Sequence, residues 1–224
     1  MGDQSTGEAA GGAPAEPSRA LSIVAICGSL RRGSFNAALL RTALELAPAD
    51  LEFDRYDGLR AIPPFDDDVR QQGLPDAVAD LAARIDRTDG VLIATPEYNF
   101  GLPGVLKNAL DWVSCAGESP YASPLRHKAV GMMGASAGLM GTVRAQQGLR
   151  ALCHFTDSQP MLRPEVFVQK AWERFDGDGR LVDEPTRALV ETFMTAFRDF
   201  VSWRLEVGPP PAAPVSFVAS PAAS

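Results

Sequence analysis

Apolar runs and helical repeats alternate along this chain in a regular order. Apolar stretches, several rich in β-branched residues, predict parallel strands at residues 21–27, 51–56, 90–95, 128–133 and 166–168. Apolar residues spaced three and four positions apart predict helices around residues 40–47, 78–85, 103–112, 142–153 and 190–201. Residues 58–75 hold three prolines and are predicted to form a loop. This alternation indicates an α/β domain, a parallel sheet with helices on both faces and right-handed crossovers.

The predicted fold class also predicts where the chemistry lies. Open parallel sheets bind ligands beyond the carboxyl ends of their strands, where the strand order reverses. The loops that follow the first, third and fourth predicted strands are therefore the candidate site.

The two ends of the chain differ in composition from the rest. Residues 1–20 and 208–224 hold 7 of the 18 prolines and 5 of the 20 glycines. Such segments bury too little apolar surface to offset their chain entropy, so we expect disordered tails around one domain at residues 21–207. Because the chain shows no signal-peptide pattern and no apolar run of roughly 18 residues, we expect a cytoplasmic protein without a membrane partner.

Charge and cysteine content exclude several function classes. The formal net charge is −7, with 21 basic and 28 acidic residues, so the sequence does not predict nucleic-acid binding. Three cysteines are too few for a disulfide framework. The cysteines and the two histidines show neither C-x-x-C nor H-x-x-x-H spacing, so we expect no metal site.

The segment after the first predicted strand, residues 28–36, reads GSLRRGSFN. It has neither the glycine spacing of a dinucleotide-binding turn nor the Gly-Lys-Ser/Thr of a Walker A loop. It offers hydroxyls from Ser29 and Ser34, the amide of Asn36 and the guanidinium of Arg31 at the start of a helix. These groups suit a terminal monophosphate, because a helix N-terminus attracts anions. The alternative is that Ser34 only caps the helix and that Arg31 and Arg32 are solvated.

The segment after the third predicted strand, residues 95–104, reads TPEYNFGLPG. Two prolines and two glycines stiffen this turn before the next helix begins. Backbone N–H groups of a rigid loop can donate to a flat heterocycle, and Tyr98 can lie near its face or edge. The alternative interpretation is a surface turn with one aromatic anchor.

These two segments resemble the NADPH-dependent FMN reductase family of the flavodoxin-like superfamily, the group that includes chromate, quinone and azo-dye reductases. The family pattern G-S-x-R-x-x-S-x-N matches residues 28–36. A second pattern, T-P-E-Y-N-x-x-x-P-G-x-L-K-N-x-x-D-W, matches residues 95–112. The resemblance continues through residues 134–136 and covers residues 21–206.

The resemblance implies a flavodoxin-like three-layer sandwich with a five-stranded parallel sheet and a bound FMN. It implies that the FMN phosphate is held by Ser29, Arg31, Ser34 and Asn36. It implies that the isoalloxazine is lined by Pro96, Glu97, Tyr98 and Asn99, with Ser136 near its pyrimidine end.

The resemblance further implies an NAD(P)H-dependent oxidoreductase that takes a hydride from NADPH or NADH. Its acceptor would be a quinone, an azo compound, a metal oxyanion or free flavin, and no side chain would be catalytic because FMN carries the electrons. A homodimer or homotetramer is expected. One position departs from the reductases compared, since Cys115 stands where an arginine associated with anionic substrates follows the Asp-Trp pair.

Two other functions fit an FMN-binding domain of this kind. One is a flavodoxin-type electron carrier, and the other is a flavin-binding regulatory protein; neither would turn over NAD(P)H. Without the two tails the net charge is only −5, which is modest for an electron carrier, and the Pro-Glu-Tyr-Asn loop resembles the reductase version.

Overall fold

The computed structural model of this protein describes residues 19–117 and 122–209. The two tails expected at residues 1–20 and 208–224 fall almost wholly outside those residues, so the predicted domain limits stay a prediction.

The core of the molecule is one sheet in which every strand pair is parallel. Its strands are β1 (Leu21–Cys27), β2 (Leu51–Tyr56), β3 (Gly90–Ala94), β4 (Ala129–Ala135), β5 (Gln159–Pro160) and β6 (Val166–Val168). The order is β2-β1-β3-β4-β5, and β6 also pairs with β4, further along that strand. The direction in which successive strands are added reverses between β1 and β3. A ligand is therefore expected beyond the carboxyl ends of these two strands.

The predicted five-strand parallel sheet is confirmed, and one further strand joins it. The additional strand, β5, has only two residues, and one of them is a proline. A strand this short leaves no periodic signal in a sequence. It forms because the chain between α5 and β6 passes alongside β4.

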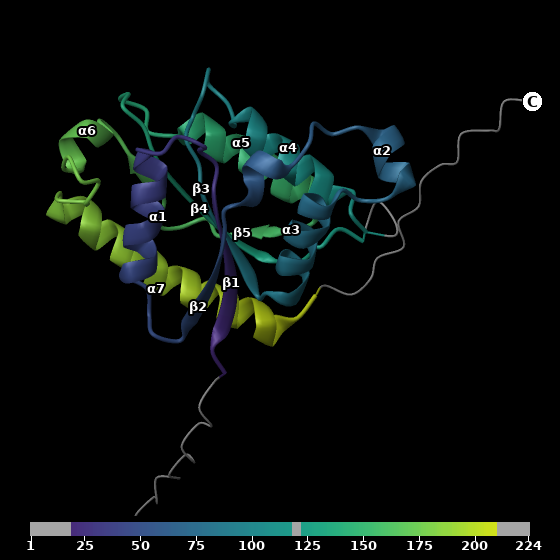
Figure 1. The fold of residues 1–224 in the computed structure, drawn as a ribbon. Coiled ribbons are helices and arrows are strands. Elements are labelled where there is room, and N and C mark those ends of the chain that lie inside the picture. The colour runs from purple at the N-terminus through teal and green to yellow at the C-terminus, as the bar shows by residue number, and fades with distance from the viewer. Residues whose placement is uncertain (1–18, 118–121, 210–224) are drawn as a thin grey trace, which may run out of the picture.

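Helices cover both faces of the sheet. The helices are α1 (Phe35–Glu45), α2 (Asp67–Gln72), α3 (Asp76–Arg87), α4 (Gly104–Ser114), α5 (Val143–Thr156), α6 (Ala171–Arg174) and α7 (Glu184–Val207), with a 3₁₀ turn η1 (Gly58–Ala61). One face packs against α1 and α7, and the other packs against α3, α4 and α5. In Figure 1, α1 lies to the left of β1 and α3 to its right. The three-layer arrangement predicted for this fold is therefore confirmed.

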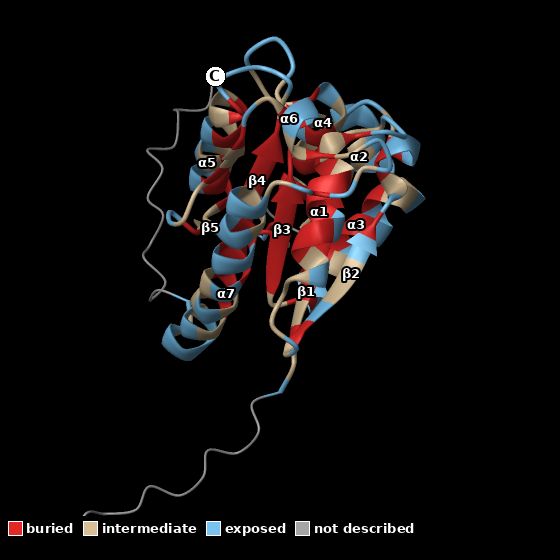
Figure 2. Ribbon diagram, turned by 90° about the vertical axis from the view of Figure 1, so that its left-hand side faces the viewer, coloured by how far each residue is buried: buried red, intermediate tan, exposed pale blue. Residues whose placement is uncertain are grey.

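The alternation of side chains along β1 builds these two layers. Ile23 and Ala25 join the apolar cluster with α1 and α7, whereas Val24 and Ile26 join the cluster with α3 and α4. Successive strand residues point to opposite faces, so an apolar run with no polar face is what a doubly covered strand requires. Figure 2 shows β3 and β4 as buried strands at the centre of the molecule.

The prediction of a continuous loop over residues 58–75 is wrong, because η1 and α2 form there. The helix α2 buries none of its residues, so it has no apolar repeat to detect. Its N-cap is Asp66, whose carboxylate accepts the backbone N–H of Asp68 at 2.9 Å. Local capping thus forms a short helix that hydrophobic patterning does not reveal.

None of the helices within the described ranges is long and apolar enough to cross a membrane.

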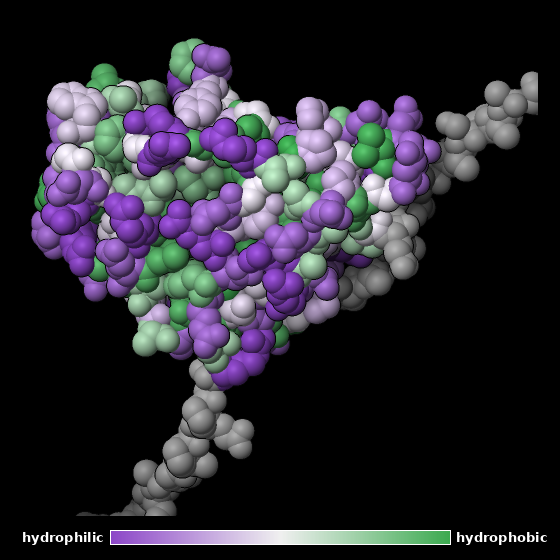
Figure 3. Space-filling view, in the orientation of Figure 1, coloured by the Kyte–Doolittle hydropathy of each residue, from purple (hydrophilic) through white to green (hydrophobic). Residues whose placement is uncertain are grey.

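On the face drawn in Figure 3, hydrophilic residues are interspersed with smaller hydrophobic areas, and both kinds occur at its upper edge. That upper edge is where the carboxyl ends of the strands lead into loops (Figure 1).

Candidate functional site

A cavity of about 850 Å³ lies at the carboxyl ends of β1, β3 and β4. Its volume falls within the roughly 300–1,000 Å³ common to small-molecule sites. The loops that follow those three strands form its walls, together with the first turn of α5. All nine residues predicted to contact a cofactor line this cavity, namely Ser29, Arg31, Ser34, Asn36, Pro96, Glu97, Tyr98, Asn99 and Ser136.

Ser34 caps the helix that starts the first wall. Its hydroxyl oxygen accepts the backbone N–H groups of Asn36 at 3.2 Å and of Ala37 at 3.3 Å. The interpretation of Ser34 as a helix cap is therefore confirmed. A serine hydroxyl also has one donor. Capping uses only the oxygen of this hydroxyl, so its O–H can donate either to the neighbouring Cys27 thiol or to a ligand.

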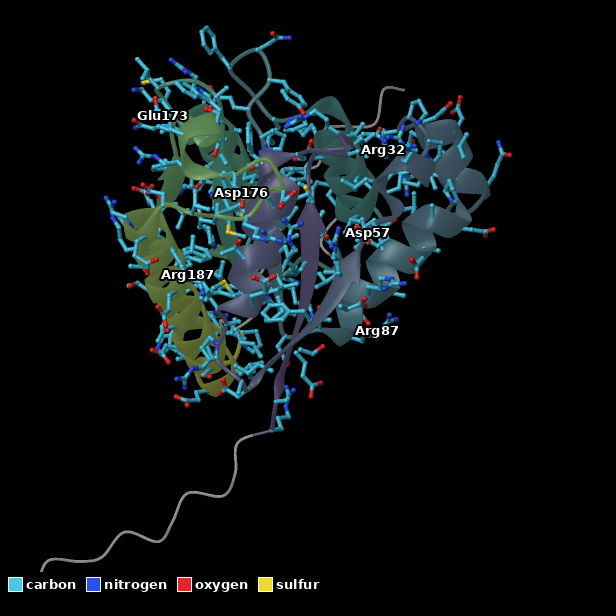
Figure 4. All side chains as sticks on the ribbon, turned by 60° about the vertical axis from the view of Figure 1, so that its left-hand side comes forward. Arg32, Asp57, Arg87, Glu173, Asp176 and Arg187 are labelled. Atoms are coloured by element: carbon cyan, nitrogen blue, oxygen red, sulfur yellow. The ribbon has the colours of Figure 1, made fainter. Side chains whose placement is uncertain are left out.

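The two arginines of the first loop differ in their placement. Arg31 lines the cavity, and its guanidinium lies 5.4 Å from the centroid of the Phe35 ring. Arg32, labelled on the same loop in Figure 4, is exposed and does not belong to the lining. Only Arg31 therefore brings a positive charge from this loop to the cavity.

Asn36 lies in the first wall but is almost fully buried, with 3% of its surface exposed. Both ends of its amide are hydrogen-bonded to the backbone of Ala135, the last residue of β4. The side chain predicted to hold a phosphate therefore also joins two walls of the cavity.

The second wall ends in a tight turn over Tyr98–Gly101. The backbone N–H and C=O groups of Tyr98 and Gly101 exchange two hydrogen bonds of 3.1 Å. Asn99 and Phe100 both adopt positive φ angles, 50° and 65°, as the two central residues of a type I′ turn do. Asparagine tolerates this region readily, whereas a bulky residue such as Phe100 does not. The turn leaves Tyr98 and Phe100 exposed, at 50% and 74%, on the rim of the cavity.

Glu97, in the same wall, is tied to the start of α5. Its carboxylate accepts the backbone N–H groups of Arg144 at 2.9 Å and Ala145 at 3.2 Å. It also pairs with the Arg144 guanidinium at 3.1 Å. That guanidinium lies 4.2 Å from the centroid of the Phe100 ring, a cation–π contact. The side chain of Glu97, predicted to line the isoalloxazine, thus carries a second role as a helix cap.

The third wall is the loop after β4. The backbone of Ser136 is anchored to the end of β6 and the start of α6. Its N–H donates to the carbonyl of Val168, and its carbonyl accepts the N–H of Ala171, both at 2.9 Å. Leu139 and Met140 follow it on the rim and are 65% and 53% exposed. The loops after β3 and β4 therefore both present exposed apolar side chains at the cavity.

The cavity lining includes nine residues that were not predicted from the sequence, namely Phe35, Phe100, Ala135, Ala137, Gly138, Leu139, Met140, Gly141 and Arg144. Phe100, Leu139 and Met140 lie within loops that the sequence already placed at the site, and their spacing carried no separate signal. Arg144 belongs to the first turn of α5. The signal available for Arg144 was its position directly after the third loop, since first-turn residues of such helices face the sheet's carboxyl edge.

The donor set of the cavity fits a flavin phosphate at one end and a flat ring at the other. Hydroxyls and the Arg31 guanidinium gather around the start of α1, while the loops after β3 and β4 add the exposed side chains of Tyr98, Phe100, Leu139 and Met140. Burial raises the pKa of the nearby Cys27 thiol, although hydrogen bonds at Ser29 and Ser34 oppose the rise. Cys27 is therefore a poor nucleophile and does not belong to the lining. Within the part of the chain that the structure describes, no cluster of three or more metal-binding side chains occurs.

Comparison with known proteins identifies relatives along most of the chain. A family model described as NADPH-dependent FMN reductase matches residues 21–173. An NAD(P)H-dependent FMN reductase from Pseudomonas aeruginosa is 40% identical over 181 residues, which are 81% of this chain and 95% of that protein. A quinone reductase from Escherichia coli is 38% identical over 186 residues, 82% of this chain and 97% of that protein.

A solved structure shows the same similarity in three dimensions. FerB, a flavoenzyme NAD(P)H:(acceptor) oxidoreductase from Paracoccus denitrificans, matches with a TM-score of 0.72 and 33% sequence identity. The match covers 82% of this chain and 98% of FerB. The similarity therefore extends over nearly the whole length of each of these relatives.

Proposed function

The chain belongs to the NADPH-dependent FMN reductase family, and we propose that the acceptor it reduces is a neutral quinone. It is an NAD(P)H-dependent oxidoreductase with FMN as its cofactor, as the family and its relatives establish. Bound FMN supplies hydride acceptance at its N5 atom and electron transfer to a second substrate. The protein's own residues bind and orient the FMN and select the electron acceptor.

In this proposal the first wall of the cavity holds the FMN phosphate. Arg31 supplies a charge-assisted hydrogen bond, and the hydroxyls of Ser29 and Ser34 supply neutral ones. The Ser29 hydroxyl lies 3.4 Å from the Tyr98 hydroxyl, so the phosphate end and the ring end of the site are linked. The residues Pro96–Asn99 and Ser136 line the isoalloxazine, with Tyr98 near the ring's face or edge.

A neutral acceptor is proposed because the positive charge of Arg144 is already paired. Its guanidinium is paired with the Glu97 carboxylate and covered by the ring of Phe100. A positive charge that is already paired attracts an oxyanion poorly, while the exposed Tyr98, Phe100, Leu139 and Met140 offer apolar contact to a flat ring. The quinone reductase from E. coli among the relatives supports the same acceptor class.

Cys115, the residue that departs from the family pattern, also favours a neutral acceptor. Cys115, the C-cap of α4, does not belong to the cavity lining. Its thiol carries no fixed positive charge, so this position adds no cation for an anionic substrate. Chromate is therefore a poorer candidate than a quinone.

Two measurements on FMN-loaded protein test this function. Anaerobic mixing with NADPH or NADH should bleach the yellow absorbance of the flavin, whereas a flavodoxin-type carrier or a regulatory protein would show no such turnover. Steady-state kcat/KM should be higher for 1,4-benzoquinone than for chromate. Higher kcat/KM for chromate would contradict the neutral-acceptor proposal while leaving the reductase assignment intact.

The proposal extends to assembly and location. We expect a homodimer or homotetramer, which light scattering coupled to size-exclusion chromatography measures directly. A cytoplasmic location agrees with the three free cysteines, because thiols stay reduced in that compartment.

A further inference from the structure

The Asn36 side chain makes a two-point contact with one residue at the end of β4. Its Nδ2 donates to the carbonyl oxygen of Ala135 at 2.8 Å, and the backbone N–H of Ala135 donates to its Oδ1, also at 2.8 Å. The two residues are 99 positions apart in the sequence. One side chain from the first turn of α1 therefore satisfies both backbone polar groups of Ala135.

The Asn36 amide bonds to the part of β4 that extends beyond the end of its neighbour β3. The pairing of β4 with β3 ends at Ala94 and Met133, after which the N–H of Thr95 donates to the carbonyl of Met133 at 2.9 Å. In a parallel ladder the backbone groups of alternate residues face the same neighbour. Ala135, two residues beyond Met133, therefore presents its N–H and C=O toward the side where β3 has ended. The Asn36 amide supplies the donor and the acceptor that this position needs.

We propose that Asn36 is a positioning residue for the flavin ring and not a ligand of its phosphate. One N–H of the Asn36 amide and one lone pair of its oxygen are bonded to Ala135, and because Asn36 is only 3% exposed, its second N–H has little access to a ligand in the cavity. The inference rests on FMN occupying the cavity, as the proposed function has it.

The residue that Asn36 holds leads directly into the ring-facing wall. Ser136 follows Ala135, and the far side of this wall is anchored by hydrogen bonds to Val168 and Ala171. Asn36 anchors the near side. Loss of its amide would leave two buried backbone groups unpaired, which favours a rearranged end of β4. The wall formed by residues 136–141 would then move relative to the phosphate loop.

The positioning role and the phosphate role predict different results with riboflavin, which has the ring of FMN but no phosphate. We would measure dissociation constants of both flavins with apoprotein by quenching of flavin fluorescence. In Asn36→Leu, both affinities should fall about tenfold, so the riboflavin-to-FMN ratio of dissociation constants stays unchanged. In Arg31→Ala, FMN affinity should fall and riboflavin affinity should not, so that ratio should shrink.

Gln146→Met is the matched control, because Gln146 is also a fully buried amide and its Nε2 donates to Thr142 and Val166. This variant should lower the melting temperature without changing either flavin affinity or the visible circular dichroism of bound riboflavin. Asn36→Leu should change that dichroism, because the ring-facing wall has moved. Asn36→Ser is uncharged and adds no repulsion toward the FMN phosphate, so it replaces Asn36→Leu in the test if the latter does not fold.

Three results would overturn the inference. A ratio that shrinks in the Asn36 variants as it does in Arg31→Ala would make Asn36 a phosphate ligand. Unchanged affinities for both flavins would show that the end of β4 does not need the amide. If Gln146→Met lost as much affinity for both flavins as Asn36→Leu, the loss would come from general destabilisation of the fold. Failure of the wild-type protein to bind either flavin would contradict the proposed function instead.

Discussion

Glu97 caps the helix that carries its own ion-pair partner, Arg144. One carboxylate oxygen accepts the Arg144 backbone N–H at 2.9 Å, and the other pairs with the Arg144 guanidinium at 3.1 Å. The Glu97 side chain is 8% exposed and that of Arg144 is 37% exposed, so the ion pair is partly exposed to solvent. Anions stabilise helix N-termini, and here the same anion also neutralises the cation that lines the cavity.

The first prediction follows from that pairing. Glu97→Gln keeps an oxygen that accepts the helix N–H groups but removes the negative charge, so the Arg144 charge becomes available to an anionic acceptor. Partly exposed ion pairs are worth about 1 kcal/mol or less, so kcat/KM for chromate should rise by up to about fivefold relative to benzoquinone. Glu165→Gln is the control, because Glu165 pairs with Arg150 outside the cavity lining. An unchanged acceptor ratio in Glu97→Gln would contradict the role of Arg144.

The second prediction concerns the phosphate end of the site. The double variant Arg31→Ala with Ser34→Ala loses a charge-assisted hydrogen bond and a hydroxyl donor, so FMN affinity should fall about 100-fold. Arg32→Ala removes the neighbouring arginine, which is not in the lining, and should leave FMN affinity unchanged. Isothermal titration of apoprotein with FMN measures both. Equal weakening in the two variants would show that the loop acts only through its overall charge.

The third prediction concerns close packing beside the cavity. A Cβ added at Gly134 would lie 2.2 Å from the Thr142 hydroxyl and 2.3 Å from the Thr95 carbonyl oxygen. Because Thr95 contributes backbone that cannot rotate away, Gly134→Ala should lower the free energy of unfolding by about 1–3 kcal/mol. Gly104→Ala, at the first position of α4, meets no neighbouring atom and should stabilise by up to about 1 kcal/mol. Urea denaturation of both variants tests the contrast in sign.

The fourth prediction concerns acid stability through Asp183, the N-cap of α7. Hydrogen bonds from Thr186, first from its hydroxyl and then from its backbone N–H, lower the pKa of this carboxyl, and Arg174 adds to the effect. A carboxyl whose pKa is depressed in the folded state stabilises the protein above its unfolded pKa of about 3.9 and loses that contribution as pH falls through the folded value.

The test uses Asp183→Asn, which keeps a capping side chain but does not titrate. Urea midpoints between pH 7 and pH 3 should fall less steeply in this variant than in the wild-type protein. Identical slopes would show that Asp183 contributes nothing to the acid dependence of stability.

The sequence determined the sheet and the location of the site. Apolar runs such as residues 90–95 have no polar face, so they predict strands covered on both sides, and the structure confirms this. Polar loops after the first, third and fourth predicted strands had to meet at one edge because parallel strands share their carboxyl end. All nine predicted residues accordingly line one cavity.

Only the tertiary structure decided how those nine side chains divide their work. Asn36 and Ala135, like Glu97 and Arg144, are hydrogen-bonded partners from distant parts of the chain. A motif names the residues at a site, but it does not show which of their polar atoms bond to the protein and which remain for a ligand. That division depends on where each strand ends and on which helix begins beside it, which is set when the three loops meet in space.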